Sequence, residues 1–114
     1  MIVVLGHERC GAVKATVEAK GKTTGSPNID AIVKTVAKSV KAASAGCAAC
    51  KGEAKCADKH KDEYVECVVE GNARRVAANL AKQSAILAHM AHAGKLKVVA
   101  AKYDLDDGKV TLLK

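Results

Sequence analysis

The stretch Ile2-Val3-Val4-Leu5-Gly6-His7-Glu8-Arg9-Cys10-Gly11 decides how the rest of the chain is interpreted. Its first part, residues 2–5, is a continuous apolar run rich in β-branched side chains, which is typical of a strand buried on both faces of a parallel sheet. Gly6 ends this run, and residues 11–20 then have the composition of a helix. The stretch therefore predicts a strand, a tight loop and a helix, in that order.

Further along the chain, apolar residues repeat at helical spacing in two places. Ser26-Pro27 offers a helix N-cap followed by proline at the first helical position, and this helix is expected to run to about residue 45. A second apolar stripe runs from Val65 to Ala91, and Gly94 is a natural C-terminal stop. We expect this second stripe to form the longest helix.

The C-terminal residues have the pattern of a β-hairpin. Residues 96–105 and 109–113 read as antiparallel strands around the turn Asp106-Asp107-Gly108. Strands separated by helices predict an α/β fold, with a mainly parallel sheet flanked by helices and a C-terminal antiparallel hairpin. A chain of 114 residues is long enough for one core, so we expect a single domain over residues 1–114.

Composition and charge exclude several classes of protein. Hydrophobic residues make up 49% of the chain, but no run approaches the ~18 apolar residues that span a bilayer, so no membrane partner is expected. The first residues lack the pattern of a secretory signal, which makes the cytoplasm the expected compartment. The net charge is +7, yet the only aromatic residues are Tyr64 and Tyr103 and the lysines form no dense cluster. We therefore expect no nucleic-acid partner.

A histidine and a cysteine stand three residues apart in the first predicted loop. The loop follows the carboxyl end of a strand and precedes the amino end of a helix, which is where open α/β sheets bind ligands. The helix N-terminus would stabilise a thiolate at Cys10, and His7 offers an imidazole nitrogen suited to zinc. The pair predicts half of a tetrahedral zinc site, although a polar turn histidine beside a semi-buried cysteine has the same pattern.

A cysteine-rich and lysine-rich insert is predicted at about residues 46–61, where the helical pattern fails. Cys47, Cys50, Cys56 and His60 place four soft ligands within a short segment, which suits a metal site, a redox pair or surface thiols. Five cysteines are an odd number in a chain without an export signal. This favours thiols or metal ligands over a disulfide framework.

The apolar strand that leads into Gly6-His7 and Cys10-Gly11-Ala12-Val13 closely resembles the second metal motif of the β-class carbonic anhydrases, G-H-x-x-C-G. The resemblance extends to that family's last helix and terminal hairpin and covers most of the chain outside residues 46–61. The matching segments are Gly71-Asn72-Ala73, Leu80, Ser84, Leu87, Gly94-Lys95-Leu96, Tyr103-Asp104-Leu105 and Gly108-Lys109-Val110.

The resemblance implies a Zn2+ cofactor with His7 and Cys10 as two of its three protein ligands. In that family the third ligand is a cysteine of an earlier C-x-D-S-R segment, whose aspartate and arginine form a dyad that gates the fourth position. This sequence contains no such segment. We hypothesise that a cysteine of the insert, or Cys67, supplies the missing ligand, for example from a second subunit.

The reaction implied by the resemblance is attack of zinc-bound hydroxide on carbon dioxide to give bicarbonate. The family also implies a homodimer or a higher homo-oligomer, in which a partner subunit would cover an open sheet edge. Three functions stay open at this point. They are an active carbonic anhydrase with an unconventional zinc shell, a non-catalytic relative that serves as a metal-binding or interaction module, and a cysteine-based redox or metal sensor centred on the insert.

Overall fold

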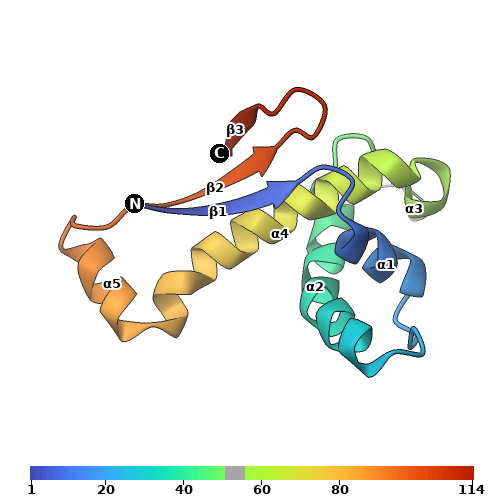
Figure 1. Cartoon of the computed structure of the whole chain (residues 1–114), viewed down its shortest axis with the longest axis horizontal. Coiled ribbons are helices and arrows are strands. Elements are labelled where there is room, and N and C mark those ends of the chain that lie inside the picture. The colour runs from blue at the N-terminus through green and yellow to red at the C-terminus, as the bar shows by residue number, and fades with distance from the viewer. Residues whose placement is uncertain (51–55) are drawn as a thin grey trace.

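The computed structural model describes residues 1–50 and 56–114 of the chain. The predicted insert at 46–61 is therefore described only in part, because 51–55 lie outside the described residues. Within the described ranges the chain forms three strands and five helices (Figure 1). In chain order they are β1 (Ile2–His7), α1 (Gly11–Ala19), α2 (Pro27–Gly46), α3 (Cys56–Lys59), α4 (Lys61–Gln83), α5 (Ala85–His92), β2 (Val98–Tyr103) and β3 (Val110–Leu113).

The three strands form one sheet in the order β1-β2-β3. β1 and β2 run parallel, with Ile2 opposite Val98 and His7 opposite Tyr103. β2 and β3 form the antiparallel hairpin that the C-terminal sequence predicts. The α/β class is thus confirmed, with a mixed sheet of one parallel and one antiparallel pairing and with helices packed against it.

Helix α4 covers one face of the sheet, and Gly6 allows it to approach closely. A Cβ atom at Gly6 would lie 3.0 Å from Cγ1 of Val69 on α4. Because side chains alternate along a strand, Val3 and Leu5 point to the opposite face, where 44% and 52% of their surfaces are exposed. The prediction that β1 is buried on both faces is therefore wrong. The reason is that, in the part of the chain that the structure describes, no helix lies against that second face (Figure 1).

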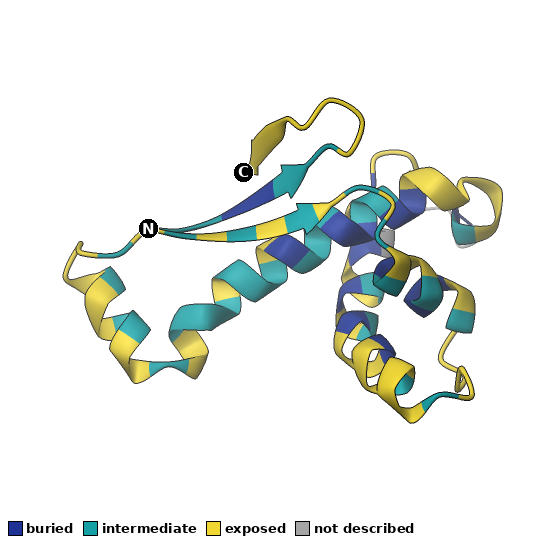
Figure 2. Cartoon of the chain, in the orientation of Figure 1, coloured by how far each residue is buried: buried dark blue, intermediate teal, exposed yellow. Residues whose placement is uncertain are grey.

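The hydrophobic core lies beyond the sheet, where α1, α2, α3 and the N-terminal half of α4 meet (Figure 2). Val68 at its centre is fully buried, and the phenol of Tyr64 donates a hydrogen bond of 2.9 Å to the carbonyl of Val40. The other buried members of this core are Val13, Val17, Val36, Ala43, Cys47, Cys50, Cys56, Val65 and Val69. This packing fixes α4 beside the end of β1, where the candidate ligands lie.

The prediction of one continuous helix from Val65 to Ala91 is wrong, because the structure has two helices there. Ser84 is extended, with φ −137° and ψ 112°, and separates α4 from α5. Its hydroxyl accepts a hydrogen bond of 3.3 Å from the N–H of Leu87, so it is the N-cap of α5. An apolar stripe runs through such a break unchanged, and periodicity alone therefore does not reveal it.

Candidate functional site

His7 is the last residue of β1 and is exposed to solvent. Its Nδ1 lies 2.9 Å from the main-chain carbonyl oxygen of Glu8. A proton on Nδ1 that is donated to this carbonyl leaves Nε2 as the free acceptor. The histidine can therefore offer Nε2 to a metal ion while the other ring nitrogen holds the ring in place.

Cys10 occupies the N-cap position of α1 and is half-buried against the core. The first turn of α1 contains no acidic residue, so the positive end of the helix is not neutralised there. Among the described residues, Cys10 is the cysteine left outside a disulfide. Its thiol is therefore not consumed by a disulfide, and its role as a metal ligand stays a prediction.

The segment His7–Cys10, which we call the metal loop, turns sharply at Arg9. Arg9 has a φ of 50°, in the left-handed region that residues other than glycine seldom adopt. Its main-chain N–H donates a hydrogen bond of 2.8 Å to Oε1 of Glu66 on α4. The side-chain acceptor on α4 thus holds the loop in a conformation that the backbone disfavours.

The side chain of Arg9 forms a two-point ion pair with Asp106 in the hairpin turn. The two guanidinium nitrogens lie 2.7 and 3.0 Å from the carboxylate oxygens. The hydrogen bonds and charge of Asp106 raise the pKa of Arg9, and Arg9 in turn lowers the pKa of Asp106. This pair connects the metal loop to the turn between β2 and β3.

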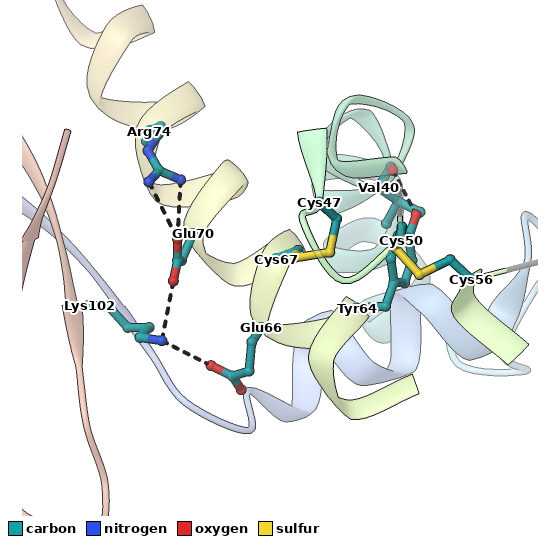
Figure 3. Close-up of a disulfide and its surroundings, with 10 residues drawn as sticks. All are labelled: Val40, Cys47, Cys50, Cys56, Tyr64, Glu66, Cys67, Glu70, Arg74 and Lys102. Carbon is teal, nitrogen blue, oxygen red and sulfur yellow. Dashed lines mark hydrogen bonds and ion pairs between the residues drawn. A yellow bond between two sulfur atoms is a disulfide. The ribbon is translucent and has the colours of Figure 1, made fainter. Parts of the chain in front are cut away.

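Lys102 of β2 lies between two carboxylates of α4, those of Glu66 and Glu70 (Figure 3). Its Nζ is 3.2 Å from Glu70 and 3.7 Å from Glu66. Burial lowers the pKa of Lys102, but the hydrogen bond and charge of Glu70, with the charge of Glu66, outweigh burial and raise it. Glu66 therefore has two partners. It accepts the hydrogen bond from the N–H of Arg9, and it faces the charged ammonium group of Lys102.

The described residues contain one group of three side chains close enough to share a metal ion, and it includes neither His7 nor Cys10. Single oxygen atoms of Glu8, Asp104 and Asp106 lie within 4.8 Å of one another. These carboxylates already accept hydrogen bonds from Arg9 and from main-chain N–H groups of the turn. Oxygen ligands suit magnesium or calcium better than zinc, so this group does not complete a zinc shell.

A cavity of about 510 Å³ lies beside the metal loop, between the loop and the start of α4. Glu8 and Arg9 of the loop line it, but His7 and Cys10 do not. Its other lining residues are Lys14, Asp62, Glu63, Val65 and Glu66. The two candidate ligands therefore lie outside this acidic cavity.

The cysteines of the insert form two disulfides, so the prediction of thiols or metal ligands there is wrong for this state of the protein. Cys47 is bonded to Cys67 and Cys50 to Cys56, with Cα atoms 5.6 and 5.1 Å apart (Figure 3). The chain brings these pairs together where α2, α3 and α4 meet, and cysteine spacing alone does not specify such pairing. Metal binding by the reduced cysteines, with or without His60 at the start of α4, stays a prediction.

Two anchors of the metal loop were missed in the sequence. Glu66 lies within the stretch predicted to be the longest helix, and Asp106 lies in the predicted turn. The bond from Arg9 to Glu66 spans 57 positions and the pair with Asp106 spans 97. No local pattern signals contacts over such separations.

Comparisons with known proteins assign this chain to a family. Residues 1–110 match the family model described as carbonic anhydrase. Among solved structures, the β-carbonic anhydrase CafA of the fungal pathogen Aspergillus fumigatus is similar, with a TM-score of 0.69 and 23% sequence identity. The match covers 98% of this chain but 47% of that chain, so this chain spans about half the length of the similar enzyme. A search of curated proteins finds no match.

Proposed function

Because this chain belongs to the β-carbonic anhydrase family, we propose that its metal loop binds zinc and serves the reversible hydration of carbon dioxide. The observation that carries the proposal is that His7 and Cys10 flank one turn, with Nε2 of the histidine free and the cysteine outside the disulfides. Nitrogen and sulfur are the donors that zinc prefers in proteins. The chemical type of the two donor atoms therefore fits zinc.

The donor set is smaller than a catalytic zinc site needs. Three protein ligands and one open position are usual, and this loop offers two ligands. When bound, zinc would supply a hydroxide nucleophile at neutral pH by lowering the pKa of a coordinated water toward about 7. The chain's own contribution would be to orient His7 through the Glu8 carbonyl and to present the sulfur of Cys10 at the helix N-terminus.

We propose that the remaining ligand comes from a second polypeptide, most simply another copy of this chain in a homodimer or higher homo-oligomer. The uncovered face of the sheet supports this, because Val3 and Leu5 on β1 and Leu112 on β3 are about half exposed or more. Apolar sheet faces of this kind are usually covered by another layer or by a partner. In the described, oxidised state the insert cysteines are bonded to one another, so they would have to be reduced before one of them could serve as the missing ligand.

The test is metal content per chain together with carbon dioxide hydration, on protein purified without added zinc. The parent is compared with the double variant His7→Ala, Cys10→Ser and with His92→Ala, an exposed histidine on α5 as a matched control. We expect the double variant to lose both zinc and hydration, and the control to keep both. A parent that holds no zinc, or zinc that is insensitive to the double change, would refute the proposal.

A non-catalytic role is the second candidate, and the incomplete ligand set is the observation that favours it. Such a protein would bind zinc through His7 and Cys10, yet its zinc-loaded form would hydrate carbon dioxide no faster than the double variant. The hydration assay on zinc-loaded parent separates the two. Size-exclusion chromatography with light scattering shows at the same time whether the tested protein is a homo-oligomer.

The cytoplasm remains the proposed compartment. Among the described residues, no helix is long and apolar enough to cross a membrane. Disulfides in the cytoplasm of most organisms are transient and redox-responsive. Alkylation of free thiols in rapidly quenched cells, followed by mass spectrometry, would report whether the two bridges exist there or form only after lysis.

A further inference from the structure

The two disulfides differ in how far solvent can reach them. The solvent-exposed fraction is 1% for Cys50, 2% for Cys56 and 5% for Cys47. Cys67 is only half-buried, and with Cys47 it lines a cavity of about 170 Å³. The Cys47–Cys67 bridge is therefore the more accessible of the two to a thiol from solution.

The cavity is open because two glycines stand beside the bridge. Gly46 at the end of α2 and Gly71 within α4 both line it, and a Cβ atom built at either position would meet nothing within 4 Å. Glycine in the middle of a helix is destabilising relative to alanine. No neighbouring atom requires glycine at position 71, but the absence of a side chain there leaves the space beside the Cys47–Cys67 bridge open.

Cys67, Gly71 and Arg74 follow one face of α4 at positions i, i+4 and i+7. A rise of 1.5 Å per residue puts the Cα atoms of Cys67 and Arg74 about 10 Å apart along the axis. Cys67 thus lies at one end of the cavity lining and Arg74 at the other. A thiol of low molecular weight that carries a carboxylate would offer one group to each end.

One cation, Arg74, lines the far end of the cavity. Glu70 also lines the cavity, but its carboxylate is paired with Lys102 at 3.2 Å and with Arg74 at 3.3 Å (Figure 3). Lys102 is also paired with Glu66 at 3.7 Å, and Nε of Arg74 donates a hydrogen bond of 2.7 Å to the main-chain carbonyl of Lys114. Arg74 is itself exposed, and exposed ion pairs of this kind exchange readily for another anion.

We propose that the Cys47–Cys67 bridge is a thiol-exchange site for a low-molecular-weight thiol that bears a carboxylate, and that the Cys50–Cys56 bridge is not. The thiolate of the small molecule attacks Sγ of Cys67 and forms a mixed disulfide there. The Cys47–Cys67 bond breaks, and its electron pair leaves with Sγ of Cys47, which takes a proton from water. A second thiolate then attacks the sulfur of the attached molecule. This step releases the oxidised small-molecule disulfide and leaves Cys67 as a thiol.

The experiment is exposure of the oxidised protein, residues 1–114, to reduced glutathione, a thiol with two carboxylates, followed by acid quenching and peptide mass spectrometry. We expect Cys67 to carry the mixed disulfide, and the Cys47–Cys67 bridge to open at least about tenfold faster than Cys50–Cys56, because exchange depends on access. Opening of Cys50–Cys56 first, attachment at Cys50 or Cys56, or purified protein without the Cys47–Cys67 bridge would overturn the proposal.

Two pairs of variants test the cavity itself. Gly71→Leu should slow opening of Cys47–Cys67 by about tenfold by filling the space, and Gly71→Ala should change it less than about twofold. Arg74→Gln should slow the reaction with glutathione by about threefold and leave that with uncharged β-mercaptoethanol unchanged. Equal rates for Gly71→Leu and Gly71→Ala, or equal slowing of both thiols by Arg74→Gln, would refute the assigned geometry. The arginine variant is at an exposed position, so it keeps the test valid if the leucine variant fails to fold.

Discussion

The metal loop and the cysteine-bridged region use the same chemical group in opposite ways. In the metal loop, Cys10 is kept apart from other cysteines, and the backbone around it is held by hydrogen bonds and an exposed ion pair. In the region of residues 47–67, cysteines are bonded to one another within the core of the helices. A cysteine thus stays available as a metal ligand only where the fold keeps it from forming a disulfide with another cysteine. Stability and ligand chemistry are consequently assigned to different parts of the chain.

The largest effect should come from removing the Cys47–Cys67 bridge, which closes the longer segment of chain. We expect Cys47→Ala with Cys67→Ala to lower the free energy of unfolding by about 2–4 kcal/mol, because the bridge restrains the unfolded chain. Urea unfolding under non-reducing conditions measures this, with Cys10→Ser as the matched control that should cost much less. An equal loss in both proteins would mean that the metal loop contributes as much to stability as the bridged region does.

The contact between β1 and α4 should give the next largest effect. Gly6→Ala places a Cβ 3.0 Å from Val69 Cγ1, and we expect a loss of about 1–3 kcal/mol through overpacking. Gly11→Ala is the control, since nothing lies within 4 Å of its Cβ position. Urea unfolding of both variants would show whether the strand that carries His7 depends on this close approach. A loss at Gly11 equal to that at Gly6 would contradict it.

Removing the acceptor of the Arg9 N–H should have a smaller and local effect. We expect Glu66→Ala to cost about 1 kcal/mol and to speed hydrogen exchange at the Arg9 amide, because this N–H loses its acceptor. Glu70→Ala is the matched control, since it removes the other carboxylate beside Lys102 and leaves the Arg9 N–H bonded. If both variants speed exchange at Arg9 alike, Glu66 does not anchor the metal loop.

The smallest effect should be the pH dependence of the Arg9–Asp106 pair. The pKa of Asp106 is lowered in the folded protein, so the pair contributes stability above the ordinary carboxyl pKa and loses it as the pH falls through the lowered value. Asp106→Asn should therefore be less stable than the parent at pH 7, and the gap should close in acid. Both side chains are exposed, so the gap is small and should shrink in salt. Unfolding curves at pH 7 and in acid, with Asp107→Asn as control, measure it, and a gap that widens in acid would be the opposite of this expectation.

Local sequence rules predicted much of the fold. The apolar run before Gly6, the Ser26-Pro27 helix start and the C-terminal hairpin all appear where their own residues indicate them. The break at Ser84 escaped prediction because it depends on a side-chain cap within an uninterrupted apolar stripe. The exposed face of β1 escaped because its apolar run does not say whether a second layer is present.

For the candidate site, local spacing predicts the shared loop of His7 and Cys10 but not the contacts that support this loop. His7 and Cys10 are close in sequence, so their shared loop follows from local spacing. Glu66 and Asp106 reach that loop only through the packing of α4 and the hairpin against β1 and β2. The disulfide partners were likewise set by three helices meeting, which the cysteine spacing of the insert does not specify.

The two bridges are nested, since Cys50–Cys56 lies wholly within the segment closed by Cys47–Cys67. A protease that cuts the chain once between residues 57 and 66 would leave both fragments joined through Cys47–Cys67, and a cut between 51 and 55 would leave them joined twice. The clipped protein would run as one band in a non-reducing gel and separate into an N-terminal fragment with the metal loop and a C-terminal fragment with most of α4 after reduction. In an oxidising medium, the chain can therefore be severed in this segment and remain a single molecule.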